Sequence, residues 1–345
     1  MKLLVLTQKV DKDDAVLGFF HKWLEKMAAR CESVVVICLG CGRYDLPVNI
    51  KVLSLGKEQG ASRLRYVINF FNYIWRERRN YDRIFVHMNP EYLVLGGWLW
   101  FCLRKPAYLW FNHQYGNWLA RCGQIWTTKI FYTSPQSFFA GSSKSISMPV
   151  GIDTDNFRRQ GDEPRQNNSC LCLGRISPVK NIEVLIEAVK MLDKNGVGLV
   201  VKIIGSALNK DQDYLKALKA SSAELVSIGK VFWQEEIPNY QTPTIYRQYD
   251  FFVNLTNSGS LDKAILEAMA CGCLTLVSNT SLEAVLPAEL LFKEKDSIDL
   301  SQKIIEILGW TEEKKEALRV SLADYVEKAH SLNMLLDRIF FYLNS

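Results

Sequence analysis

The sequence predicts an α/β protein of two domains, each built on a parallel sheet with helices packed on both faces. The first observation is length, because 345 residues exceed what one ordinary hydrophobic core holds. The second is the alternation of short apolar runs with segments of helical periodicity, which is typical of parallel strands joined by helices. The third is that this alternation occurs twice, on either side of a polar, irregular stretch at residues 158–169.

The first domain is expected over residues 1–150. Its strands are predicted in five short apolar runs, KLLVLTQ, SVVVICL, RIFVHM, AYLWFN and KIFYTS. A longer segment, ASRLRYVINFFNYIWRERR, has apolar residues at helical spacing. We expect one buried stripe on this helix, formed by Leu64, Val67, Ile68, Phe71 and Ile74.

The second domain is expected over residues 151–329 and begins near the segment PVGIDTDNF at residues 149–157. Its strands are predicted in CLCLG, GLVVKIIG, DFFVNLT and CLTLVSN, again with helices between them. We expect both sheets to be doubly wound and the two halves to face each other across a central cleft. Ligands of such sheets bind beyond the carboxyl ends of the strands, so the loops after the strands are the first place to look for a site.

The composition is that of a soluble globular protein, with 48% hydrophobic and 23% charged residues. The chain has 42 Lys and Arg against 37 Asp and Glu, and the resulting charge of +5 is too small for a dedicated nucleic-acid binder. Anionic small molecules or an anionic membrane surface remain open as partners. Charged residues soon follow the apolar run at residues 3–6, so we expect no secretory leader and a cytoplasmic protein.

Neither a spanning helix nor a cysteine site is expected. The longest uncharged apolar stretch, Tyr92–Leu103, is shorter than the roughly 20 residues that a membrane-spanning helix needs. The nine cysteines lie mostly in apolar, strand-like runs and are expected to be reduced core residues. Cys38 and Cys41 form a C-x-x-C pair, but no second pair follows at zinc spacing, so a metal or redox role is not favoured.

The segment GRISPVKN follows a predicted strand and carries two cations on a short loop. Gly174 would let the backbone approach a ligand closely, and Arg175 and Lys180 would place permanent positive charge at the carboxyl end of the strand, where a phosphate could bind. The loop alone also fits two cations that simply face solvent. Asn181 is predicted to cap the helix that follows. The inward positions of this helix are predicted to be Ile182, Leu185, Ile186, Val189 and Leu192.

A second candidate site lies in SGSLDKAILEAMACGC, residues 258–273. Ser260 is predicted to cap a helix whose first turn contains Asp262, and the free backbone N–H groups there would suit an anion. Glu267 lies about two turns into this otherwise apolar helix, where its charge would be costly without donors. Two adjacent ribose hydroxyls could supply them. The alternative is an i,i+4 pair with Lys263, which is the weaker order for such a pair and contributes about 0.2 to 0.5 kcal/mol.

Together with PVGIDTDNF and LWFNH, these two segments resemble the retaining glycosyltransferases of glycosyltransferase family 4, which have the two-domain GT-B fold. The resemblance covers nearly the whole chain and rests on the combination of motifs. It implies that Arg175 and Lys180 grip the donor diphosphate. It implies that Glu267 is the second glutamate of the family's E-x7-E element, which holds the nucleotide ribose. It also implies that residues 330–345 form a helix that crosses back to the first domain.

The sequence departs from the family pattern at the first glutamate of that element, because Gly259 stands eight residues before Glu267. In the family this carboxylate contacts the donor sugar. Here we expect the backbone at Ser260 and Leu261, or the side chain of Asp262, to substitute for it. Donor-sugar recognition is therefore where this chain should differ from the family.

Two residues of the first domain also match the resemblance. His113, directly after the predicted strand AYLWFN, resembles the family histidine that faces the donor sugar, although a lone histidine is often structural. Gly18 resembles the glycine of the first strand-to-helix loop, which lets the backbone approach the donor phosphate and the acceptor. Asp153 and Asp155 mimic the D-x-D metal motif of a different glycosyltransferase fold. They lie in the segment that links the domains, so we expect no metal.

The acceptor is expected on the first domain, where aromatic and basic residues occur together and suit sugar stacking or docking at an anionic bilayer. Core packing is the alternative for most of the tryptophans. The tryptophans in question are Trp98, Trp100, Trp110, Trp118 and Trp126, and the cations are Arg104, Lys105 and Arg121.

The resemblance predicts transfer of a hexose-type sugar from a nucleotide-diphosphate sugar to a glycan, lipid-linked or small-molecule acceptor, in polysaccharide or glycolipid biosynthesis. No metal or further cofactor is expected. Peripheral association with the inner membrane face stays open as an alternative to a purely cytoplasmic protein. Two rivals stay open. A nucleotide-sugar epimerase shares this fold but needs no acceptor, and a non-catalytic nucleotide-sugar-binding protein would explain Gly259.

Overall fold

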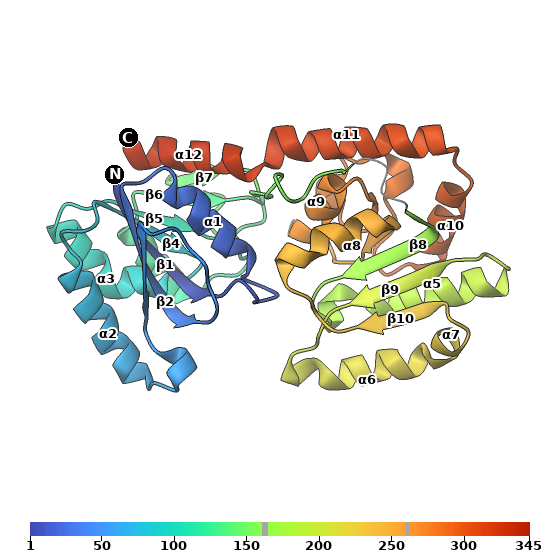
Figure 1. Cartoon of the computed structure of the whole chain (residues 1–345), viewed down its shortest axis with the longest axis horizontal. Coiled ribbons are helices and arrows are strands. Elements are labelled where there is room, and N and C mark those ends of the chain that lie inside the picture. The colour runs from blue at the N-terminus through green and yellow to red at the C-terminus, as the bar shows by residue number, and fades with distance from the viewer. Residues whose placement is uncertain (161–164, 260–261) are drawn as a thin grey trace. The chain divides into compact units, whose positions relative to one another are not determined.

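The computed structural model describes residues 1–160, 165–259 and 262–345 (Figure 1). The chain forms two compact units. Unit 1 consists of Met1–Gly151, Pro238–Tyr240 and Leu332–Ser345, and unit 2 consists of Ile152–Ile237 and Gln241–Ser331. Each unit contains one parallel sheet, of seven strands in unit 1 and five in unit 2. The predicted fold class of two parallel-sheet α/β domains is confirmed.

The sheet of unit 1 has the strand order β3-β2-β1-β4-β5-β6-β7. Side chains alternate between its two faces, and both faces are buried. On β1, Leu3 and Val5 join one core, whereas Leu4 and Leu6 join the other. This double burial explains the continuous apolar runs in the sequence. The strands are β1 (Lys2–Val10), β2 (Ser33–Cys41), β3 (Ile50–Ser54), β4 (Arg83–His87), β5 (Ala107–Trp110), β6 (Lys129–Tyr132) and β7 (Ser145–Ser147).

Helices cover both faces of this sheet (Figure 1). The first core is closed by α1 (Phe19–Ala28) and α12 (Leu332–Asn344), so the C-terminal helix packs within unit 1. The second core is closed by α2 (Arg63–Arg76), α3 (Glu91–Cys102) and α4 (Trp118–Ile125). Among the described residues, no helix has both the length and the hydrophobicity that crossing a bilayer requires.

The buried stripe predicted for α2 is wrong in part. Ile74 is buried, but Leu64 and Ile68 are exposed, and Phe70 takes the central place in the core. The helix has apolar residues on more than one side, so periodicity alone could not choose the side that packs.

The sheet of unit 2 has the strand order β10-β9-β8-β11-β12, with parallel pairing throughout. Its strands are β8 (Gln166–Leu173), β9 (Val200–Ile204), β10 (Val231–Gln234), β11 (Tyr249–Asn254) and β12 (Leu274–Val277). Its helices are α5 (Ile182–Lys194), α6 (Gln212–Ser221), α7 (Ala223–Ser227), α8 (Thr242–Gln248), α9 (Lys263–Ala270), α10 (Ser297–Leu308) and α11 (Glu312–His330). Because all five strands run the same way, their carboxyl ends share one edge of the sheet.

Candidate donor site on unit 2

Two glycines meet where β8 and β9 end. Gly174 follows β8 and has φ +147°, and its N–H donates to the carbonyl of Ile204 at 3.0 Å. Gly205 follows β9 with φ +159°, and a Cβ added there would lie 1.9 Å from the carbonyl oxygen of Gly174. Nothing lies within 4 Å of a Cβ added at Gly174 itself, so that side of the loop is open. The two glycines therefore bring the two loops into direct contact beside an open space.

The two predicted cations lie together. Arg175 and Lys180 line one small hollow with Asn254 and Leu255, which end β11 and begin the next loop. Arg175 is exposed, and among the described residues it has no hydrogen-bonding partner. Its guanidinium is therefore available to an anion at the carboxyl edge of the sheet.

Lys180, by contrast, is already paired. Its ammonium makes an ion pair with Asp262 and donates to Thr256 Oγ1 at 3.1 Å. The same carboxylate accepts from Asn254 Nδ2 at 3.1 Å and from the Ala264 N–H at 3.3 Å. Burial alone would raise the pKa of Asp262, but the charge and hydrogen bond of Lys180, with the Asn254 amide, hold that pKa below its ordinary value.

Asn181 directly precedes α5 at the N-cap position, but its side chain does not cap the helix. The residue adopts a left-handed conformation with φ +46°, and its amide donates to the Leu255 carbonyl and to Asn257 Oδ1, both at 2.9 Å. These two hydrogen bonds connect the loop that carries Arg175 and Lys180 to the loop after β11. The inward positions predicted for this helix are confirmed, since Ile182, Leu185, Ile186, Val189 and Leu192 are all buried.

The predicted start of α9 is wrong by two residues. The helix begins at Lys263, and Asp262 is its N-cap, because its carboxylate accepts from the Ala264 N–H. Asp262 is thus outside the first turn, and it takes the capping role predicted for Ser260. Ser260 and Leu261 lie outside the described residues.

Glu267 is buried, with 6% of its surface exposed, and the hydroxyl of Tyr246 donates to its Oε2 at 3.5 Å. One turn earlier on α9, burial lowers the pKa of Lys263 to about 8, against the opposing pull of the negative charges on Glu267 and Asp153. The alternative pair of Glu267 with Lys263 therefore has a physical basis in the fold. The ribose role of Glu267 stays a prediction.

Two segments that follow β12 in the chain contact the residue before Gly259. Gly259 has φ +117°, a conformation that suits glycine. The Ser258 N–H donates to Glu294 Oε1 at 2.6 Å, and Ser258 Oγ accepts from the Thr280 N–H at 2.9 Å. The hydrogen bond from Ser258 lowers the pKa of Glu294. A carboxylate from a segment 36 residues away thus reaches this loop.

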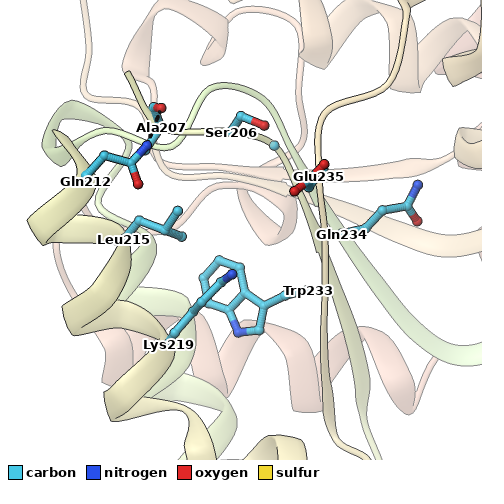
Figure 2. Close-up of a pocket in the computed structure, with 9 residues that line it drawn as sticks. Ser206, Ala207, Gln212, Leu215, Lys219, Trp233, Gln234 and Glu235 are labelled. Carbon is cyan, nitrogen blue, oxygen red and sulfur yellow. Dashed lines mark hydrogen bonds between the residues drawn. The ribbon is translucent and has the colours of Figure 1, made fainter. Parts of the chain in front are cut away.

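A larger hollow opens at the carboxyl ends of β9 and β10 (Figure 2). Its volume is about 340 Å³. Figure 2 shows Leu215 and Lys219 on α6 beside Trp233, Gln234 and Glu235, with the Lys219 side chain drawn across the Trp233 ring in this view. The Trp233 indole donates to Ser222 Oγ at 3.1 Å, which fixes the ring. Such a hollow offers a flat aromatic surface with polar groups around it.

Sequence reasoning missed several of these residues. Asn254 and Thr256 gave a weak signal, because they are polar residues where a buried strand ends. Trp233 gave none, because its strand was not predicted. The contribution of Glu294 depends on a contact between segments 36 residues apart, which no local pattern shows.

The two candidates of unit 1 have different surroundings. His113 is exposed and lines a hollow of about 360 Å³ with Asn89, Glu91 and Tyr115, beyond the ends of β4 and β5. Gly18 precedes α1, and a Cβ added there would lie 2.4 Å from the carbonyl oxygen of Asp14. The loop's own packing therefore already requires glycine at that position.

The D-x-D segment lies where unit 2 begins. The amide of Asn156 donates to Asp153 Oδ2 at 2.5 Å, and the backbone of Phe157 donates to the Asp153 carbonyl at 2.8 Å. Within the described part of the chain, no group of three or more His, Cys, Asp or Glu side chains is arranged to hold a metal ion. The structure describes all nine cysteines, and each is a free thiol.

Several solved structures share this architecture. Anabaena HepE in complex with UDP-glucose is 17% identical, with 100% of each chain covered and a TM-score of 0.76. The HepE complex with UDP has the same identity and coverage and a TM-score of 0.77. Sucrose-phosphate synthase from Thermosynechococcus elongatus is 15% identical, covers 99% of this chain and 98% of its own, and has a TM-score of 0.73. The chain therefore has the GT-B fold of glycosyltransferases.

The sequence comparison adds a family to the fold. Residues 153–321, which make up most of unit 2, match the family described as glycosyl transferases group 1. No curated protein sequence matches the chain.

Proposed function

We propose that this chain is a metal-independent, retaining glycosyltransferase. It moves a hexose-type sugar from a nucleotide-diphosphate sugar to a glycan, lipid-linked or small-molecule acceptor. The proposal rests on the order in which two hollows and a contact between two glycines occur along one edge of the unit 2 sheet. The hollow beside Trp233 lies at β10 and β9, the contact of Gly174 with Gly205 lies at β9 and β8, and the hollow of Arg175 and Lys180 lies at β8 and β11.

This order matches the parts of a nucleotide sugar. Neighbouring strands lie about 4.8 Å apart, so three intervals, from β10 to β11, span about 14 Å. In the proposal the base enters the hollow beside Trp233, the diphosphate lies over Gly174 and meets Arg175 and Lys180, and the sugar extends toward the loop at residues 254–259. The HepE complexes with UDP and UDP-glucose support a donor of this class.

The cations carry most of the proposed chemistry. The bond from the anomeric carbon to the diphosphate breaks as a bond to the acceptor oxygen forms on the same face, and the acceptor proton passes to the departing phosphate. One unit charge about 4 Å from the growing negative charge contributes about 4 kcal/mol at an effective dielectric near 20. That is roughly a thousandfold in rate for each well-placed cation, which lets Arg175 and Lys180 do the work a metal does elsewhere.

The other predicted residues are given positioning roles in the same scheme. Glu267 holds the ribose, and Asp262 keeps Lys180 in place and caps α9. The Gly259 loop, with the backbone of Ser260 and Leu261, meets the sugar. For unit 1, the resemblance assigns His113 to the donor sugar, and it assigns the backbone at Gly18 to the donor phosphate and the acceptor.

The test begins with a panel of nucleotide sugars, scored by thermal stabilisation and by hydrolysis of the donor. A transferase should be stabilised by one donor class, hydrolyse it slowly, and release a nucleoside diphosphate faster when the right acceptor is added. Activity should survive EDTA, and the anomeric proton coupling of the product should match that of the donor. Inversion of configuration, or activity that EDTA abolishes and only a divalent ion restores, would refute the corresponding part of the proposal.

The same panel separates the two rivals. An epimerase would change the sugar of the donor when no acceptor is present. A non-catalytic binding protein would be stabilised by a donor yet would neither hydrolyse nor transfer it over a broad set of acceptors.

A further inference from the structure

The helices on one face of the unit 1 sheet leave apolar side chains exposed. These helices are α2, α3 and α4, and we call their solvent side the outer face of the α2–α4 layer. Trp100, the inward tryptophan of α3, is fully buried, so the exposed residues are not substitutes for a missing core. The exposed apolar residues of the outer face are Leu64, Ile68 and Trp75 on α2, Trp98 and Phe101 on α3, and Trp118 and Ile125 on α4.

The spacing places these residues on the same side. Positions 64, 68 and 75 are separated by four and seven residues, which is one side of a helix, and positions 98 and 101 are separated by three. The helices are also in contact. The ring of Phe70 on α2 lies 6.2 Å from that of Trp100 on α3, and a Cβ added at Gly97 of α3 would lie 2.3 Å from Trp126, which ends α4. The outer face is therefore one surface.

The segment that forms this face also carries the positive charge of the protein. Residues 61–128 contain nine Lys and Arg against three Asp and Glu, so the other 277 residues contain 33 basic and 34 acidic residues. One of the three acidic residues, Glu77, is buried and accepts hydrogen bonds from Lys51 and Asn80. Its charge therefore adds little to the electrostatic potential at the outer face. The exposed arginines of the segment are Arg63, Arg65, Arg76, Arg79, Arg104 and Arg121.

Cations and aromatic rings are also adjacent at the C-terminal ends of these helices. The guanidinium of Arg78 lies 4.3 Å from the ring centroid of Trp75. Beside Phe101, a hollow of about 500 Å³ is lined by Trp126 and Arg104 among others. Tryptophan and arginine side chains can keep apolar groups in lipid while their polar ends remain at the headgroups.

We propose that the outer face of the α2–α4 layer docks on an anionic lipid bilayer, with its aromatic and aliphatic side chains among the headgroups and its arginines against the lipid phosphates. The partner follows from the combination of a contiguous apolar face with a local charge of +6 in an otherwise balanced chain. The contact is peripheral. It does not depend on the donor or on the transfer reaction.

Co-sedimentation of the full chain with vesicles tests this docking. We expect binding to vesicles of phosphatidylglycerol mixed with phosphatidylcholine, weak binding to phosphatidylcholine alone, and loss of binding at high salt. Phe101→Ser should weaken binding about tenfold. Arg79→Gln and Arg104→Gln should each weaken it about fivefold.

The chain offers a matched control on the other side of the same unit. Phe341 on α12 is 68% exposed, close to the 73% of Phe101, but it lies outside the α2–α4 layer, so Phe341→Ser should bind like the unaltered protein. Trp118→Ser supplies a second loss-of-binding variant on α4. Melting temperatures of these variants should match that of the unaltered protein, because each side chain is exposed.

Three results would overturn the proposal. The first is no binding to either vesicle, or equal binding to both. The second is equal loss for Phe341→Ser and for Phe101→Ser. The third is a concentration-dependent dimer, seen by light scattering, that Phe101→Ser disperses, because that result would assign the face to a second copy of this chain.

Discussion

The ammonium group of Lys180 lies between the carboxylate of Asp262 and the hydroxyl of Thr256, so the cation proposed to meet the donor diphosphate has an anionic partner within its own unit. Asp262 also caps the helix that carries Glu267. A phosphate that binds Lys180 must therefore share it with Asp262. The carboxylate fixes the position of the ammonium and reduces the charge that the donor meets.

Removal of either cation should reduce transfer sharply. Arg175→Ala should lower turnover by about a thousandfold, because it removes about 4 kcal/mol of charge stabilisation from the leaving diphosphate. Lys180→Ala should lower turnover by a smaller factor, because Asp262 already offsets part of the charge of this ammonium. Lys190→Ala, on the surface of α5, is the control and should leave turnover unchanged. Steady-state rates with the identified donor check the prediction, and full activity in both cation variants would remove the proposed assignment.

Asp262→Asn should separate the charge of this residue from its capping role, because asparagine is an equally good N-cap. We expect a loss of about 2 kcal/mol in the free energy of unfolding at neutral pH, since a hydrogen bond between charged groups is lost. The pKa of Asp262 is held below its ordinary value of 3.8, so the unfolded chain takes up the proton first as the pH falls. The stabilisation is therefore present above about pH 4 and is lost as the pH falls through the folded-state pKa.

Melting temperatures of the unaltered protein and of Asp262→Asn, compared from pH 7 to pH 3, measure this effect. The difference between them should stay constant down to about pH 4 and narrow below it. If the difference in melting temperature is the same at pH 3 as at pH 7, the charge of the Asp262 carboxylate does not contribute to stability.

Glu267→Gln distinguishes the two interpretations of this carboxylate. If Glu267 holds the ribose, the variant should lose donor affinity by about tenfold or more while its melting temperature changes little, because glutamine can still accept from Tyr246. If Glu267 mainly balances Lys263, the melting temperature should fall and donor affinity should stay the same. Calorimetric binding of the donor and thermal unfolding, measured on the same sample, decide between them.

The sequence predicted most of both sheets, and the strands that it missed are all at sheet edges. The missed strands β3 and β7 end the sheet of unit 1, and β10 ends the sheet of unit 2. An inner strand is covered on both faces and becomes a continuous apolar run, but an edge strand is less covered and keeps polar residues. On β3, for example, all five residues are at least partly exposed. Because β10 was not predicted, the hollow beside Trp233 was not predicted either.

The site was predicted to the extent that it is local. Arg175 and Lys180 could be paired because both lie on one short loop after a strand. The contacts of Lys180 with Asp262 and of Asn181 with Leu255 join segments more than 70 residues apart, and only the parallel order of β8 and β11 brings these segments together. The exposed side of α2 was misassigned for a different reason, because that helix has apolar residues on two sides and the sequence pattern does not say which one packs.

The contact between the loops after β8 and β9 should depend on Gly205. Gly205→Ala would place a Cβ 1.9 Å from the Gly174 carbonyl oxygen at a φ that alanine disfavours. We expect a loss of more than about 2 kcal/mol in the free energy of unfolding, together with loss of donor binding. Gly198→Ala is the matched control in the same unit, because nothing lies within 4 Å of its Cβ, and it should change stability by less than about 1 kcal/mol. Equal unfolding curves for the two variants would contradict the proposed close contact.

The hollow beside Trp233 should set the affinity for the nucleotide. Trp233→Ala removes the flat surface against which a base would stack, and stacking on an aromatic side chain contributes about 1 to 3 kcal/mol, so the nucleoside diphosphate of the identified donor should bind about 5- to 150-fold more weakly. Trp310→Ala is the control, because that ring follows α10 and lies under the ammonium of Lys314 at 3.8 Å. Isothermal titration of that nucleoside diphosphate into both variants gives the comparison. The same affinity in Trp233→Ala as in the unaltered protein would place the base elsewhere, and the order of features from β10 to β11 would then no longer describe the bound donor.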